Sequence, residues 1–327
     1  NGTLSQPTPL AIGMPQGSVV GPNGFPAYTS PIFEIARRHG IQIHMYADDT
    51  QLFLPFQPEH FKPSMARLES CLAEIREWLS ANHLKLNDEK TEFVMIGAKN
   101  LLGKISDEIT LKIGDSVIPA APVAKNIGAY LDREMNLNVH VQNVVRCAYI
   151  HLRNIGKIRK FITQDVAETL VHAFVSSRLD NLNSLLVGLP EKTLQKLQVV
   201  QNNAARLVLR KKRRDRATPL RKALHWLPIN ARVNYKVCLL SFKAMNGLAP
   251  SYLANLLTPY QPRRFLRSAH RNLLEEKPYN LKRTGGRSFS VQAPRLWNCL
   301  PDDTRNCTEL NQFKTNLKTF LFKKSYD

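Results

Sequence analysis

The sequence has few of the features that mark secreted or membrane proteins. Its five cysteines are scattered, with no pair at the spacing of metal ligands, so we expect a reduced intracellular protein without a zinc site. No apolar run approaches the ~20 residues needed to cross a bilayer, so we expect no membrane partner. With 43% hydrophobic residues, the chain is not depleted in core-forming side chains, which excludes a disordered protein. Its 327 residues suffice for about two domains.

Acidic residues are scarce in the last two fifths of the chain. Residues 200–327 hold 26 Lys and Arg against 7 Asp and Glu, whereas residues 1–199 hold 20 against 19. This uneven charge predicts a polyanionic partner, because neutralising phosphates releases counterions and gives affinity without sequence choice. An anionic membrane surface is the other physical option, but no basic amphipathic helix is obvious. Nucleic acid is favoured.

Two adjacent carboxylates interrupt a β-favouring stretch, Ile43-His44-Met45-Tyr46-Ala47-Asp48-Asp49-Thr50-Gln51-Leu52-Phe53. The pattern predicts a hairpin whose turn is formed by residues 47–49. Such a turn brings both acids to one end of a sheet, where their oxygens can bind a divalent cation that offsets their repulsion. An Asp-rich surface turn is the alternative.

Three further motifs accompany this hairpin. Upstream lies Gly13-Met14-Pro15-Gln16-Gly17-Ser18, a loop whose backbone can approach a ligand closely. Downstream lie Leu84-Lys85-Leu86-Asn87-Asp88-Glu89-Lys90-Thr91-Glu92 and Asn126-Ile127-Gly128-Ala129-Tyr130. In this order, the four segments resemble motifs B to E of the reverse transcriptases of non-LTR (LINE-type) retrotransposons.

The resemblance implies an α+β fold, a partial polymerase palm in which helices pack on an antiparallel sheet. A helical thumb and a basic, mostly helical C-terminal region follow it. The implied domains are residues 1–137, 138–215 and 216–327. The implied partners are an RNA template, a DNA primer, deoxynucleoside triphosphates and the N-terminal part of the same polyprotein. The implied location of the protein is the nucleus and cytoplasm, as a ribonucleoprotein.

The resemblance also implies RNA-templated DNA synthesis with two Mg²⁺ ions. Asp48 and Asp49 would hold the metal, and Tyr46 would lie near the primer end. Four further positions take roles by their motifs: Gln16 and Gly17 at template and nucleotide, Gly128 in the primer grip, and Lys90 as proton donor to pyrophosphate. An ordinary surface lysine is the alternative for Lys90.

The family uses a third carboxylate, on a strand before the Gln16 loop. None of the acids in this chain stands in a matching motif, and the fingers are missing as well, so we expect residues 1–327 to be inactive alone. A nucleic-acid-binding module without catalysis and a retrotransposon relic are the alternatives.

Periodicity predicts the other elements. Helices are expected over residues 33–38, closed by Gly40, and over 64–82, capped by Ser64. Residues 93–97 suggest a strand and Gly114-Asp115 a further hairpin turn. Gly24 and Pro26 disfavour a helix after Gly21. Downstream, helical periodicity covers residues 138–160, 163–178 and 191–211.

Two cationic segments have open interpretations. The run Arg210, Lys211, Lys212, Arg213 and Arg214 is a solvated linker, a localisation signal or a nucleic-acid backbone contact. In the tail, cations interleave with aromatic residues, which suits either single-stranded nucleic acid or a small core with arginines outside. These tail residues are Arg267, Arg271, Lys282, Arg283, Arg287 and Arg295 with Phe265, Tyr279, Phe289 and Trp297.

Overall fold

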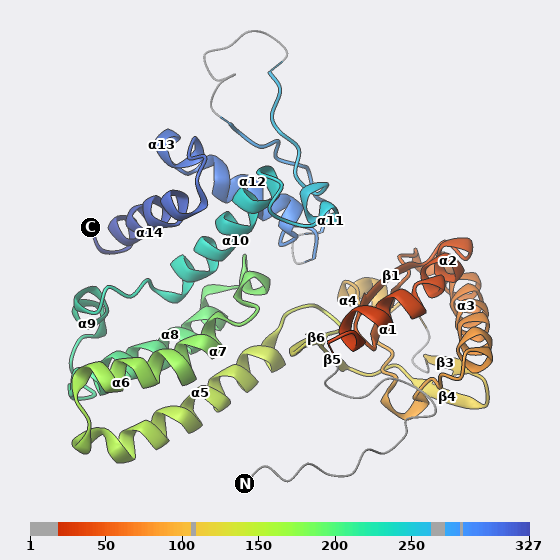
Figure 1. The fold of residues 1–327 in the computed structure, drawn as a ribbon, viewed down its shortest axis with the longest axis horizontal. Coiled ribbons are helices and arrows are strands. Elements are labelled where there is room, and N and C mark those ends of the chain that lie inside the picture. Colours follow the sequence, from red (N-terminus) through yellow and green to blue (C-terminus); the bar gives the residue numbers. More distant parts are fainter. Residues whose placement is uncertain (1–18, 106–108, 263–271, 282–283) are drawn as a thin grey trace. The chain divides into compact units, whose positions relative to one another are not determined.

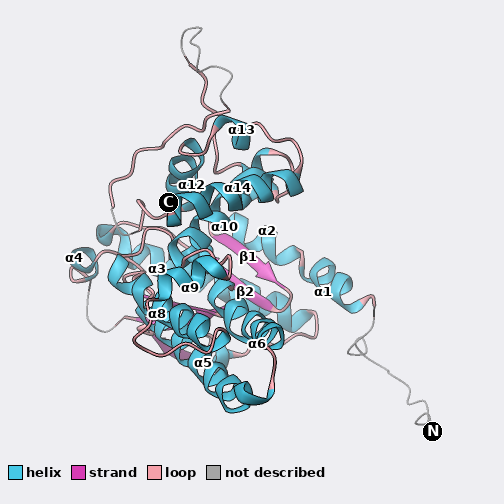
Figure 2. Ribbon diagram, turned by 90° about the vertical axis from the view of Figure 1, so that its left-hand side faces the viewer, coloured by secondary structure: helices cyan, strands magenta, loops and turns pink. Residues whose placement is uncertain are grey.

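A computed structural model describes residues 19–105, 109–262, 272–281 and 284–327. The fold is α+β, with helices predominating over short antiparallel hairpins (Figures 1 and 2). The chain divides into two compact units, residues 1–95 with 99–121 and residues 96–98 with 122–327. Within the described ranges, the strands form three separate two-stranded sheets, β1-β2, β3-β4 and β5-β6, in place of the single sheet expected of a palm. The predicted boundaries at residues 137/138 and 215/216 stay predictions.

The first unit contains the segments that carry the palm motifs. Its elements are α1 (Gly21–Thr29), α2 (Pro31–Arg38), β1 (Gln42–Tyr46), β2 (Asp49–Phe53), η1 (Pro58–His60), α3 (Phe61–Ala81), η2 (Asp88–Lys90), α4 (Lys99–Leu102), β3 (Thr110–Ile113) and β4 (Ser116–Pro119).

The helix α3 confirms the amphipathic helix predicted near residues 64–82. It begins three residues earlier than expected, so Ser64 is buried inside the helix and is not its cap. Cys71 and Ile75 on α3 pack with the helix α2 in one apolar cluster. The prediction that α2 closes at Gly40 is confirmed, because Gly40 has φ 63° and its N–H donates to Arg37 O at 3.0 Å.

Helix α1 corrects the expectation that Gly24 and Pro26 disfavour a helix after Gly21. Pro26 has no N–H and cannot donate to the carbonyl of Pro22, four residues earlier. Pro22 is exposed in the first turn, where water can satisfy that carbonyl. At the other end, the Thr29 hydroxyl donates to Phe25 O at 2.9 Å. The cost of the proline therefore falls where solvent reduces it.

The strand predicted at residues 93–97 is wrong. Phe93 makes only an isolated bridge with Ala120, and its carbonyl accepts from Ala121 N at 2.7 Å. The chain leaves the first unit after Met95, and the Gly97 N–H donates to Arg133 O at 2.9 Å. Two different partners at its two ends prevent this apolar run from pairing along one strand. The hairpin predicted at Gly114-Asp115 is confirmed by the pairing of β3 with β4.

The second unit begins with a hairpin and continues as packed helices. Its elements are β5 (Val123–Asn126), β6 (Ala129–Asp132), α5 (Asn138–Ile158), η3 (Arg159–Phe161), α6 (Gln164–Val171), the π-helical η4 (His172–Ser176), α7 (Ser177–Asp180), η5 (Asn183–Leu186), α8 (Glu191–Val208), α9 (Ala217–Ala223), α10 (Ile229–Met245), α11 (Ser251–Ala254), α12 (Phe289–Asn298), α13 (Asp302–Arg305) and α14 (Leu310–Tyr326).

The three helical segments predicted for residues 138–211 are confirmed, as α5, α6 to α7, and α8. Their buried residues join those of α10, α12 and α14 in one hydrophobic core. At its centre the ring of Phe313 stacks on Phe242, with centroids 4.2 Å apart, and lies 5.8 Å from the ring of Trp297. None of the helices in the described ranges combines the length and apolar character needed to cross a membrane.

The described part of the tail favours the core interpretation of its aromatic residues. Trp297 is buried, and its indole N–H donates to Asn272 O at 2.7 Å. Arg287 donates to the carbonyls of Val187 and Met135 at 3.1 and 2.6 Å, and burial lowers the pKa of its guanidinium. These two side chains stabilise the second unit internally. Phe265, Arg267, Arg271, Lys282 and Arg283 lie outside the described residues.

Candidate functional site

The acidic motif lies at the tip of the β1-β2 hairpin, as the sequence predicts. The strands pair antiparallel, with Ile43 opposite Leu52 and Tyr46 opposite Asp49. Side chains alternate between the faces of a strand, and Ile43, Met45 and Leu52 pack on the cluster formed with α2 and α3. This apolar face fixes the register, because a slip of one residue would expose all three. The register in turn holds the two acids at the free end.

The turn is tight and its backbone is strained. Ala47 has φ 54°, a left-handed conformation that costs a non-glycine residue roughly 1–2 kcal/mol. Asp48 follows in the turn and Asp49 opens β2, so two adjacent carboxylates share one hairpin end. Backbone strain at a hairpin tip is consistent with a position constrained by function.

Both carboxylates are open to solvent. Asp48 and Asp49 are exposed, and neither carboxylate makes a hydrogen bond or ion pair with any residue that the structure describes. Two unpaired acids side by side repel each other, and a divalent cation would relieve that repulsion. Carboxylate oxygens are the ligands that Mg²⁺ prefers, and Mg²⁺ commonly keeps several waters beside one or two carboxylates. The donor set therefore fits Mg²⁺, although no group of three or more His, Cys, Asp or Glu side chains forms within the described ranges.

One face of the hairpin presents aromatic side chains to solvent beside the acids. Tyr46 is 65% exposed and lies opposite Asp49 in the register. Farther from the tip, the rings of His44 and Phe53 meet edge to face at 5.6 Å, and Phe53 is also exposed. Flat aromatic groups next to a cation site offer surfaces on which a base or sugar can rest.

The segment that carries Lys90 is anchored to the same unit. The Asn87 side chain caps the short helix η2 by accepting from Lys90 N at 3.2 Å. Asp88 accepts from Arg76 of α3 and from Ser116 of β4, each at 3.1 Å. These bonds fix the backbone and leave the Lys90 side chain exposed. Its role as proton donor stays a prediction.

Gly128 and the basic run belong to the second unit. Ile127 and Gly128 form the two-residue turn between β5 and β6, with φ 43° and 85°. Glycine adopts such angles without strain, which explains this residue at the turn. The predicted hairpin is thus confirmed, whereas its role as primer grip stays a prediction.

The members of the basic run have different surroundings. Arg210 donates to the carbonyls of Arg159 and Ile162, both at 3.2 Å, and so has a structural role. The side chains of Lys211, Lys212, Arg213 and Arg214 are exposed in a turn after α8. Gln16 and Gly17 lie outside the described residues, so their roles stay predictions.

The part of the chain that carries the four motifs matches a known protein family. Residues 1–136 match the family model described as reverse transcriptase (RNA-dependent DNA polymerase). This segment is related to reverse transcriptases. The match covers all four motifs and ends shortly after the β5-β6 hairpin.

Two relatives from Drosophila melanogaster extend this relationship. The RNA-directed DNA polymerase from mobile element jockey is 25% identical over 150 residues, which are 44% of this chain and 16% of that protein. The probable RNA-directed DNA polymerase from transposon BS is 23% identical over 273 residues, 81% of this chain and 29% of that protein. The chain thus spans less than a third of either relative. No solved structure matches it significantly.

Proposed function

We propose that the chain is part of the RNA-directed DNA polymerase of a non-LTR retrotransposon. The observation that carries this proposal is that the carboxylates of Asp48 and Asp49 lie exposed and without partners at a hairpin tip, in a segment related to reverse transcriptases. The substrates would be an RNA template, a DNA primer and deoxynucleoside triphosphates.

The proposed roles follow the positions of the side chains. Asp48 and Asp49 would hold Mg²⁺, which would stabilise the negative charge of the transferring phosphoryl group. Tyr46, exposed beside Asp49, would contact the primer end. Lys90 is mounted on an anchored turn, so its ammonium can donate a proton to the leaving pyrophosphate. Gln16 and Gly17 would contact template and nucleotide, and the Gly128 turn would contact the primer.

Magnesium-dependent nucleotide binding tests the proposal. With a primer–template bound, Mg²⁺ should raise the affinity of the wild-type chain for deoxynucleotide. In the double variant, Asp48→Ala with Asp49→Ala, Mg²⁺ should no longer raise this affinity. Asp115→Ala is a matched control, because Asp115 is an exposed acid at the tip of the β3-β4 hairpin in the same unit. Equal Mg²⁺-dependent binding by wild type and double variant would refute the metal site.

Primer extension in the same samples tests a separate expectation. The proposed metal site offers two carboxylates, Asp48 and Asp49, whereas the family uses three, so residues 1–327 should bind nucleotide without extending the primer. Templated extension by this chain that the double variant loses would contradict that expectation and support the metal site.

A nucleic-acid-binding module without catalysis is the second candidate. It is favoured by the charge of residues 122–327, which hold 36 Lys and Arg against 13 Asp and Glu. In that case RNA binding would be salt-sensitive and indifferent to both Mg²⁺ and the Asp48-Asp49 substitutions.

A further inference from the structure

Two adjoining hollows lie along helix α8 in the second unit. The first, of about 640 Å³, lies between α8 and α9, and its lining includes Arg206, Arg216 and Arg221. The second, of about 960 Å³, faces α5 and the basic run. Both hollows are open to solvent, and Asn202 and Arg206 line both of them. They therefore form one continuous surface that crosses α8.

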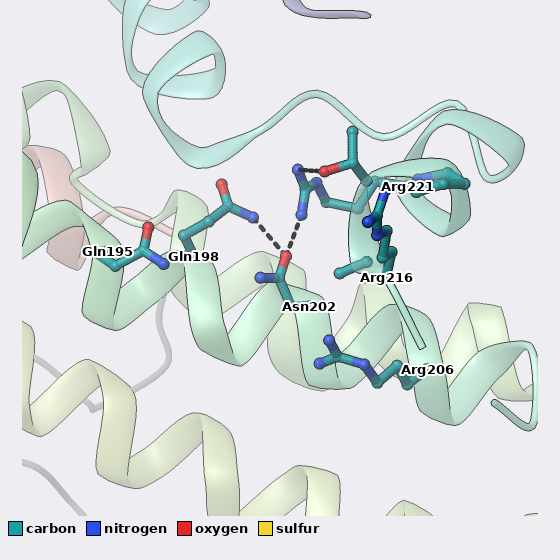
Figure 3. A pocket seen from close by; sticks show the side chains of 9 residues that line it. Gln195, Gln198, Asn202, Arg206, Arg216 and Arg221 are labelled. Atoms are coloured by element: carbon teal, nitrogen blue, oxygen red, sulfur yellow. Dashed lines mark hydrogen bonds between the residues drawn. The ribbon is translucent and has the colours of Figure 1, made fainter. Parts of the chain in front are cut away.

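The first hollow gathers positive charge without an acid to balance it. Three arginines line it together with amide, hydroxyl and apolar groups, and none of its lining residues is acidic. Figure 3 shows Gln195, Gln198, Asn202 and Arg206 on one helix, with Arg216 and Arg221 facing them from the following segment. The nearby Asp215 is already engaged, because its carboxylate accepts from Lys212 N at 2.7 Å.

Arg221 is the most informative residue of this hollow. Its side chain is buried, yet no carboxylate among the described residues pairs with it. It donates to Asn202 Oδ1, interacts with the Tyr326 hydroxyl and donates weakly, at 3.4 Å, to Thr218 Oγ1. Its Nε has no hydrogen-bond partner of good geometry within the described part of the chain. A buried cation with an unused donor is costly unless an anion completes its coordination. The planar guanidinium fork suits the oxygens of a phosphate.

We propose that Arg206, Arg216 and Arg221 bind a phosphate of single-stranded nucleic acid, and that the strand continues across α8 into the second hollow. The shared residues favour a polymer over a free phosphate, because one strand can place neighbouring phosphates in both hollows. The second hollow adds Lys211 and Arg213 for the backbone and the partly exposed ring of Tyr149 on which a base can stack. The choice of nucleic acid as ligand rests on the proposed function.

Salt-dependent binding of a labelled single-stranded RNA tests the assignment. Arg216→Ala should weaken binding severalfold at physiological salt and reduce the slope of log K against log salt by about 0.7, the value of one phosphate contact on a single strand. Lys318→Ala removes an exposed lysine of α14 that lines neither hollow, so its slope should equal that of wild type. Equal slopes for Arg216→Ala and Lys318→Ala would overturn the proposal.

A conservative change separates phosphate binding from a structural role of Arg221. Arg221→Lys keeps the charge but loses the fork, so affinity should fall severalfold while the thermal unfolding temperature changes little. If Arg221→Lys fails to fold, a change in the RNA decides. RNA with neutral methylphosphonate linkages should bind Arg216→Ala and wild type equally well. Retention of the difference between the two proteins on this uncharged backbone would refute phosphate recognition.

Competition by inorganic phosphate separates a polymer from a free anion. RNA should displace bound phosphate from this surface, whereas saturable phosphate binding that RNA leaves undisturbed would overturn the nucleic-acid assignment. All these measurements are made in EDTA, so they do not depend on the proposed magnesium site. Failure of the magnesium test in the proposed function would therefore leave this result standing, and the reverse also holds.

Discussion

At the residue scale, Ala47 is the position where the acidic turn carries most strain. Its left-handed backbone, φ 54°, favours glycine over alanine. Ala47→Gly should therefore raise the free energy of unfolding by about 0.5–1 kcal/mol, after the entropy of the unfolded glycine is subtracted. Urea denaturation measures the change. Ala27→Gly is the control of opposite sign, because Ala27 is exposed within α1, where glycine should cost about 0.5–1 kcal/mol.

His140 gives a prediction about pH. Its side chain is 3% exposed, its Nδ1 has no hydrogen-bond partner among the described residues, and burial lowers its pKa below 6.5. The unfolded chain therefore binds a proton more readily than the folded one. The free energy of unfolding should fall as the pH drops through 6.5 towards the lower folded pKa, and this loss should be absent above 6.5.

Denaturation at several pH values measures this effect. His140→Gln should flatten the dependence between about pH 7.5 and about pH 5.5, whereas His60→Gln, at an exposed histidine, should leave it as in wild type. An unchanged slope in His140→Gln would show that another group titrates.

The residues of the candidate site differ in how far sequence alone could place them. Asp48 and Asp49 could be predicted, because a hairpin tip is a local feature read from alternating apolar residues. Arg221 could not be. Its burial depends on contact with Asn202, nineteen residues away on α8, and no local pattern distinguishes it from the exposed arginines of the neighbouring run.

At the element scale, the end of α8 is held by an arginine from another segment. Arg159 donates to the carbonyls of Leu207 and Val208 at 2.9 and 2.7 Å, and to Ile162 O at 2.9 Å. Carbonyls in the last turn of a helix lack partners within that helix, so these bonds supply what the helix cannot. Arg159→Ala should lower the free energy of unfolding by about 2–4 kcal/mol. Arg153→Ala, at an exposed position on α5, should change it by less than about 0.5 kcal/mol in the same denaturation experiment.

The elements show where local patterns are sufficient and where they fail. Helices α3, α5 and α8 follow their apolar periodicity, and the hairpins follow turns at Asp48, Gly114 and Gly128. The apolar run 93–97 satisfies the same local criteria as a strand and yet remains unpaired beyond a single bridge, because it passes from one unit to the other. Strand formation depends on a pairing partner elsewhere in the chain, and the residues of the segment alone do not reveal whether that partner exists.

At the scale of the whole molecule, charge separates the two units. Residues 1–121 hold 10 Lys and Arg against 13 Asp and Glu, and residues 122–327 hold 36 against 13. The acidic hairpin thus belongs to a nearly neutral unit, whereas the excess positive charge belongs entirely to the other. We expect metal binding and nucleic-acid binding to respond to different substitutions, each in its own unit. A diffuse attraction by net charge would respond to the loss of any exposed cation.

Neutralising the basic run tests that division. Replacing Lys211, Lys212, Arg213 and Arg214 with Gln should lower the slope of log K against log salt for single-stranded RNA by about 3, since each lost phosphate contact contributes about 0.7. A matched variant replaces four exposed cations of the first unit, Lys62, Arg67, Lys99 and Lys112, and has the same net charge. If the run contacts the nucleic-acid backbone, the first-unit variant keeps the wild-type slope and only the variant of the basic run lowers it. If the run is a solvated linker or a localisation signal, both variants change the slope equally. Both variants should remain folded, because every replaced side chain is exposed and no core contact is removed. Circular dichroism of both proteins checks this.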